Sequence, residues 1–189
     1  MDDIAPLRLA SDTFAERIAE VGPDQHFLPT PCGDWNVAGL ITHVLGGNHM
    51  AVRLLEGAHR AEAIGYLSGL PLGDDPLATF RANADEQLAA FSEPGALERI
   101  VEHPMGDLPG SAVLGFRIGD LTLHAWDLAT AVGGTEELPV ALVEKVWADL
   151  EPLSDNIATI GIFGDGPSGD VPEDAPLQTR LLDLVGRRP

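Results

Sequence analysis

Cysteine is almost absent from this chain of 189 residues, because Cys32 is the only one. A single cysteine excludes an internal disulfide framework. A chain of this length also buries a full core without the help of a structural metal. Any metal that the protein binds is therefore expected to serve function rather than folding.

Basic residues are scarce as well. The chain has 11 Lys and Arg residues against 30 Asp and Glu residues, which gives a formal net charge of -19. Contacts to nucleic-acid phosphates need clustered Lys and Arg, so we expect no nucleic-acid partner. The same shortage argues against an anionic membrane surface. If the substrate is an anion, its pocket must offset this negative field with a metal or an arginine.

The sequence also has no apolar run long enough to cross a membrane. Its first residues, Met1-Asp2-Asp3, are acidic and do not resemble the basic and then apolar start of a signal segment. We therefore expect a cytoplasmic protein without a membrane partner. Hydrophobic residues make up 44% of the chain and charged residues 22%, which is typical of a globular domain.

Apolar residues at three- and four-residue spacings predict an all-α fold. Asp34 and Asn36 are both candidate N-caps of the second helix, and Asp75 followed by Pro76 is a typical helix start. The expected helices cover residues 4–21, 35–55, 76–93, 110–132, 139–153 and 177–185. The main helices predict a four-helix bundle with irregular connections and a short C-terminal helix.

We expect residues 1–160 to form this bundle and residues 161–189 to form a loop and short helix packed on the same domain. Among the irregular connections, residues 57–74 are rich in glycine and predict no more than one short helical turn. Residues 97–109 predict a short extended segment. The pair Gly46-Gly47 weakens the second helix, so it either kinks there or admits a close neighbour.

Asp120 and His124 carry the first chemical signal of the sequence. They are four residues apart on a predicted helix, so their side chains share one face. A carboxylate and an imidazole presented in this way can hold one divalent cation. The alternative is a solvated Asp beside a core His, which is the commoner outcome for this spacing alone.

His43 supplies a third candidate ligand from the middle of the second helix. A lone histidine on an apolar helix face is usually a core residue, but a bundle can bring the midpoints of two helices opposite each other. Three protein ligands would leave a coordination position open, as in catalytic rather than structural metal sites.

Several neighbours of these residues have two interpretations each. Asp127 either orients His124 or is an exposed helix carboxylate. Cys32 is either a reactive thiol at a helix entry or a small buried residue. Trp35 and Trp126 either line a pocket or pack in the core. Arg117 either binds an anionic substrate or pairs with a nearby carboxylate, and we favour the pairing.

Two motifs resemble those of a known family. They are TPCGDWNV at Thr30–Val37, followed by Leu40, His43 and Gly46, and DLTLHAWDLA at Asp120–Ala129. The C-terminal segment with Phe163-Gly164, Val171-Pro172 and Arg180-Leu181-Leu182 also matches its members. The chain is identified as similar to actinobacterial metal-binding proteins related to the N-terminal domain of mycothiol-dependent maleylpyruvate isomerase, within the DinB-like superfamily.

The resemblance implies a DinB-like bundle and a metal held by His43, Asp120 and His124. Zinc is the first expectation for this donor set, with nickel, iron and cobalt as alternatives. The isomerase has glutamate where this chain has the shorter Asp120, which shifts the metal by about one methylene length. The isomerase also has an additional C-terminal domain that helps to complete its active site, so maleylpyruvate is not carried over as the substrate.

The resemblance further implies a metal-dependent enzyme that uses a small thiol such as mycothiol, either to isomerise a small electrophile or to form a conjugate with it. A second hypothesis is a non-catalytic binder of a divalent metal or a small thiol, acting as a sensor or carrier. A third is an interaction module that binds no metal, and a homodimer is compatible with each of these.

Overall fold

The structure is a computed structural model that describes residues 3–33, 35–67, 70–159, 161 and 163–189. It divides into two compact units, Met1–Glu136 and Glu137–Pro189. The first unit contains these elements: α1 (Ala5–Ala19), α2 (Val37–Leu55), α3 (Arg60–Tyr66), α4 (Pro76–Ser92), β1 (Ile100–His103), β2 (Gly106–Pro109) and α5 (Gly110–Val132). The second contains α6 (Val140–Leu150), the 3-10 helix η1 (Glu151–Thr159) and α7 (Leu177–Leu184).

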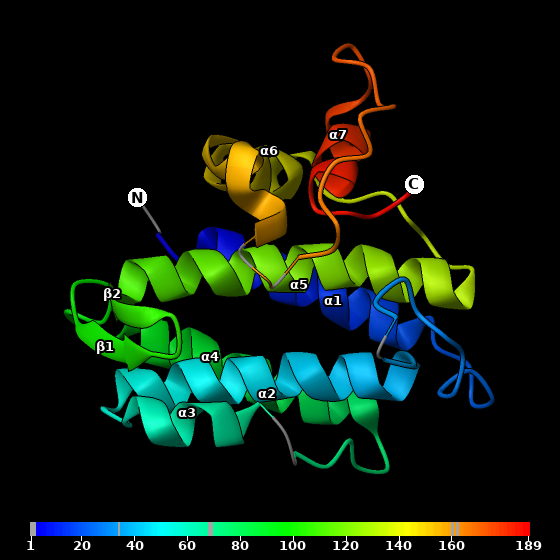
Figure 1. Cartoon of the computed structure of the whole chain (residues 1–189). Helices are drawn as coiled ribbons and strands as arrows, with labels where there is room; N and C mark the ends of the chain where they lie inside the picture. Colours follow the sequence, from blue (N-terminus) through cyan, green and yellow to red (C-terminus); the bar gives the residue numbers. More distant parts are fainter. Residues whose placement is uncertain (1–2, 34, 68–69, 160, 162) are drawn as a thin grey trace. The chain divides into compact units, whose positions relative to one another are not determined.

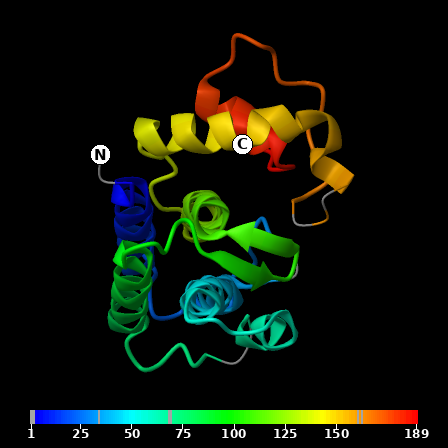
Figure 2. The same ribbon diagram turned by 90° about the vertical axis from the view of Figure 1, so that its left-hand side faces the viewer.

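Four helices of the first unit form a bundle, as the sequence predicted. Around the bundle α1 packs on α5, α5 on α2, α2 on α4, and α4 on α1 (Figure 2). Helices α1 and α5 run in one direction, whereas α2 and α4 run in the other (Figure 1). The prediction of an all-α, DinB-like fold is therefore confirmed.

Helix ends in the bundle follow from local sequence. The Asn36 side chain accepts a hydrogen bond from Gly39 N at 2.8 Å, so Asn36 caps α2. Asp75 caps α4 in the same way, with Pro76 in the first turn. At the end of α5, Gly133 adopts a left-handed conformation with φ of 70°, which stops the helix. Asp34, the other cap candidate, lies outside the described residues.

The connections are more regular than the sequence indicated. Residues expected to hold no more than one helical turn contain α3, a helix of seven residues that packs on α2. Residues expected to be extended form an antiparallel hairpin, in which Val101 pairs with Leu108. This hairpin joins α4 to α5 and contacts both α2 and α5.

The second unit is built from α6, η1 and α7, which contact one another. The Arg180 guanidinium of α7 lies over the Trp147 ring of α6, 4.6 Å from the ring centroid. The division after Glu136 groups α6 with the C-terminal residues, whereas the sequence suggested a boundary near residue 160. The packing of residues 161–189 on the bundle remains a prediction. Among the described residues no helix is long and apolar enough to cross a membrane.

Candidate metal centre

His43 lies on α2, whereas Asp120 and His124 lie on α5, and these two helices pack against each other (Figure 1). Asp120 Oδ1 lies 3.3 Å from His43 Nε2 and 3.4 Å from His124 Nε2. One potential ligand atom from each of the three residues lies within 4.8 Å of the other two. The structure thus brings together the three residues that the sequence predicted as ligands, which we call the His43–Asp120–His124 cluster.

The cluster is open to solvent on one side. The side chains of His43 and Asp120 are 22% and 23% exposed, whereas that of His124 is 8% exposed. Solvent therefore reaches His43 and Asp120, while His124 is buried.

Charge on the cluster is set by its neighbours. Burial alone would raise the pKa of Asp120, but the Arg117 guanidinium and His124 hold that pKa well below its usual value. Burial alone would lower the pKa of His124, but its interactions with Asp120, Asp127 and Cys32 raise that pKa well above its usual value. The carboxylate is consequently ionised at neutral pH, whereas a cation would have to displace a proton from His124.

The second ring nitrogen of His124 is held by Asp127. The distance from His124 Nδ1 to Asp127 Oδ2 is 2.8 Å, and Asp127 is fully buried. Because a carboxylate only accepts, Nδ1 donates to Asp127, and the proton that a cation would displace is the one on Nε2, which faces the cluster. Asp127 therefore orients His124, and the interpretation of an exposed helix carboxylate is wrong.

Cys32 joins the same hydrogen-bonded group. Its Sγ lies 3.1 Å from Asp127 Oδ2, to which the thiol donates, and 3.8 Å from His124 Nδ1. Ligand-type atoms of Cys32, His124 and Asp127 also lie within 4.8 Å of one another. Because His124 faces Asp120 with Nε2 and Asp127 with Nδ1, we interpret the group of Cys32 and Asp127 as a support for His124 rather than as a second metal site.

Trp35 covers both histidines of the cluster. Its ring stacks on His43 with centroids 4.1 Å apart and meets the edge of His124 at 5.8 Å. A tight turn places it there, because Thr30 Oγ1 donates to Trp35 O and Trp35 N donates to Cys32 O. Trp126, by contrast, is buried, which agrees with the second of its two interpretations, packing in the core.

Arg117 pairs with a carboxylate, as the sequence favoured, and the carboxylate is Asp120. Its Nη1 donates to Asp120 Oδ2 at 2.9 Å. The guanidinium also contacts the side chains of Asn48 on α2 and Gln87 on α4, both fully buried. Sequence reasoning missed these two amides, because nothing in their spacing reveals that they meet.

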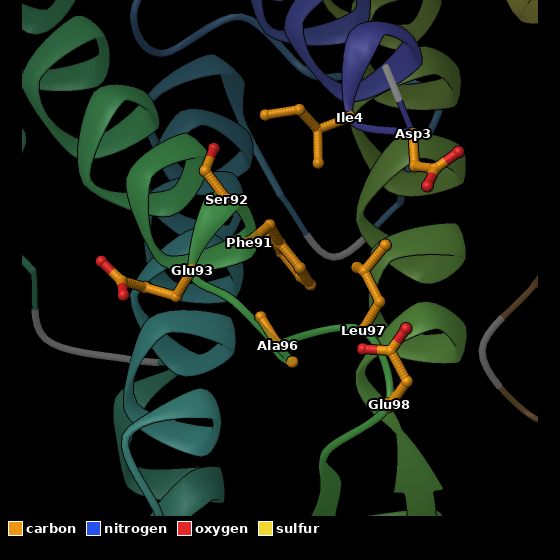
Figure 3. Close-up of a pocket in the computed structure, with 9 residues that line it drawn as sticks. Asp3, Ile4, Phe91, Ser92, Glu93, Ala96, Leu97 and Glu98 are labelled. Carbon is orange, nitrogen blue, oxygen red and sulfur yellow. The ribbon is translucent and has the colours of Figure 1, made fainter. Parts of the chain in front are cut away.

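Other histidines lie outside the cluster. His49 on α2 packs against the Tyr66 ring, His59 precedes α3, and His103 in β1 packs against Phe116. A cavity of about 340 Å³ is also separate from it (Figure 3). The cavity lies where α1 begins and α4 ends, and its polar lining is mainly acidic, with these residues: Asp3, Glu93 and Glu98. It has no ligating histidine among its lining residues.

These features define a class, namely an all-α bundle with two histidines and one aspartate converging between two helices. Residues 7–129, which contain all three, match the family described as the mycothiol maleylpyruvate isomerase N-terminal domain. The chain belongs to that family.

Relatives and solved structures agree with this placement. Two uncharacterized proteins from two strains of Mycobacterium tuberculosis are each 34% identical to the chain over 154 residues, covering 78% of the chain and 78% of the relative. Crystal structures of mycothiol-dependent maleylpyruvate isomerase and of its histidine-to-alanine mutant have a TM-score of 0.61, with 20% and 18% identity. Each likeness covers 78% of this chain and 68% of the solved chain, and it establishes a shared fold.

Proposed function

We propose that this chain binds a divalent cation through His43, Asp120 and His124, and uses it in the chemistry of a small thiol. The convergence of two imidazole nitrogens and one carboxylate oxygen within 4.8 Å carries the proposal. This donor set fits zinc best, with nickel, iron and cobalt as alternatives. The ionised state of Asp120 and the orientation of His124 by Asp127 both support it.

Three protein ligands would leave room for a further ligand on the exposed side of the cluster. When bound there, the cation would supply a thiolate nucleophile at neutral pH by lowering the pKa of a coordinated thiol. The residues of the chain prepare this position: Asp127 holds His124, Arg117 holds Asp120, and Trp35 shields one face of His43.

The thiol that we propose is mycothiol or a compound like it, because the family takes its name from an enzyme that uses mycothiol. Addition of the thiolate to an electrophilic double bond, rotation and elimination would isomerise the substrate. Addition or displacement without elimination would give a conjugate. We leave the electrophile open, since 18–20% identity to the solved isomerases does not transfer their substrate.

Metal content of the purified protein tests the binding step. We expect about one equivalent of cation in the wild type and loss of it in His43→Ala and His124→Ala, because two remaining ligands hold a divalent ion poorly. His49→Ala is the matched control, since His49 lies on the same helix but contacts Tyr66. A cation that is absent from the wild type, or unchanged in both ligand variants, would overturn the proposal.

Mycothiol added to the Co²⁺-loaded protein tests the thiol step. We expect a new sulfur-to-cobalt charge-transfer band, and consumption of mycothiol when a small electrophile is supplied. A band without consumption would identify a thiol-binding carrier. The absence of both would leave a metal protein of another function.

A further inference from the structure

Arg117 is a buried cation with partners on three helices of the bundle. It is only 5% exposed. Its Nε donates to Gln87 Oε1 on α4 at 3.2 Å, and its Nη1 donates to Asp120 Oδ2 on α5 at 2.9 Å. Its Nη2 donates to Asn48 Oδ1 at 2.8 Å and to Val44 O at 3.3 Å, both on α2. The guanidinium is thus fixed in position and orientation.

Gly47 makes room for this guanidinium. A Cβ atom at Gly47 would lie 2.2 Å from Arg117 Nη1 and 2.7 Å from Cζ, far inside contact distance. Any side chain at this position of α2 would therefore displace the guanidinium. The glycine pair of α2, whose purpose the sequence left open, includes one residue that admits the side chain of Arg117.

Fold stability alone does not explain this arrangement. A buried ion pair is often no more stabilising than apolar residues of the same volume. In addition, Asn48 Nδ2 and Gln87 Nε2 are buried without a hydrogen-bond partner among the described residues, which costs stability. Both amides use their oxygen to accept a hydrogen bond from Arg117, so holding the guanidinium in place lowers the stability of the bundle.

The two oxygens of Asp120 have separate partners. Oδ2 accepts from Arg117, whereas Oδ1 faces the ring nitrogens of His43 and His124. On the proposed function, on which this inference rests, only Oδ1 is presented to the cation. The guanidinium also cancels the carboxylate charge, so that a bound dication keeps its full double charge in an otherwise acidic protein.

We propose that Arg117 is a positioning residue, which makes Asp120 a one-oxygen ligand and keeps the centre positive enough to take an anionic fourth ligand such as a thiolate or a carboxylate. Gly47, Asn48 and Gln87 form the seat for its guanidinium. Because the shorter Asp120 reaches less far than a glutamate, its direction must be set by such a contact.

Co²⁺ titration of metal-free variants tests this role, with the visible spectrum and the affinity as readouts. In Arg117→Met the carboxylate is free to turn and to bind through both oxygens, so we expect a weaker and shifted d–d absorption. Because the carboxylate charge is then no longer cancelled and a second oxygen can bind, the affinity for Co²⁺ should rise, by about 10-fold. Arg117→Lys keeps the charge and one hydrogen bond, and should recover part of both changes.

Gly47→Ala offers an independent route, because it displaces the guanidinium without changing any charge. Its matched control is Gly65→Ala in α3, where the added carbon would meet no atom within 4 Å. We expect a shifted spectrum for Gly47→Ala and a wild-type spectrum for Gly65→Ala. If Arg117→Met does not fold, this pair and Arg117→Lys decide the matter.

The inference is overturned if the folded Arg117→Met and Gly47→Ala proteins keep the wild-type spectrum and an affinity within about twofold. It is also overturned if Gly65→Ala matches Gly47→Ala, because the effect then does not come from the guanidinium. A wild-type protein that takes up no Co²⁺ would instead defeat the proposed function itself.

Discussion

The seam between α1 and α4 has a pair of aromatic rings in contact, whereas the seam between α2 and α5 contains the His43–Asp120–His124 cluster and Arg117. In the first, the Phe14 and Phe80 rings meet with centroids 5.0 Å apart, and both are fully buried. In the second, the cluster and Arg117 lie between the helices. One bundle thus separates the contacts that stabilise it from those that we propose to bind a cation.

Helix α5 belongs to both environments. Its residues 121–129 are all buried, although Asp127 and His124 are among them. Leu121 and Leu128 are fully buried in the apolar core, while the ligating face is directed toward α2. A helix buried all round has weak amphipathicity, so its pattern alone does not reveal which face carries function.

Loss of the aromatic pair between α1 and α4 should have the largest effect on stability. Phe14→Ala removes a fully buried ring, and the cavity that it leaves should lower the free energy of unfolding by about 3–5 kcal/mol. Urea denaturation of the metal-free protein measures this. Where the variant is folded, its Co²⁺ affinity should stay near the wild-type value, and a loss of affinity as large as that of His124→Ala would show that the two seams are not separate.

For Asp127→Asn we expect a smaller effect of the reverse kind, a loss of cation affinity rather than a loss of stability. An amide can still contact His124 but no longer carries the charge that orients and polarises the imidazole, so cation affinity should fall by about 10- to 100-fold. Competition with a coloured chelator measures the change. Asp149→Asn, on the exposed face of α6, is the control. An unchanged affinity in Asp127→Asn would mean that the buried carboxylate serves packing only.

The two seams also differ in how much of them the sequence reveals. Asp120 and His124 were predictable because a helix places residues four apart on one face. His43 needed the family resemblance, since spacing along one helix does not say which faces of two helices meet. Asn48 and Gln87 were beyond reach for the same reason, as they meet Arg117 across 69 and 30 residues of sequence.

Helix boundaries were predicted well because caps are local. Asn36, Asp75 and Gly133 each mark an end by their own side chain or backbone. The division into two units could not be predicted from such local signals. Gly133-Gly134 predicted the end of a helix, but they did not predict that α6 would group with α7 rather than with the bundle. Composition within a connection does not report which unit the next helix joins.

The smallest effect is expected for His103, which lies in the β1–β2 hairpin outside both seams. Its Nδ1 accepts a hydrogen bond from Met105 N at 3.2 Å, which only the neutral ring can do. Burial, and secondarily the Arg60 charge, lower the pKa of His103 below its usual value. A lowered histidine pKa stabilises the fold above the ordinary value near 6.5, and this contribution is lost as pH falls toward the pKa of the folded state.

We therefore expect the metal-free wild type to lose more stability between pH 7 and pH 5 than His103→Asn, whose side-chain oxygen accepts the same bond without titrating. The difference should be about 1 kcal/mol or less, the net value of one hydrogen bond. Urea denaturation at several pH values measures it, and subtracting the two curves removes the titration of the cluster, which both proteins share. Parallel curves would mean that the hairpin tolerates a charged His103.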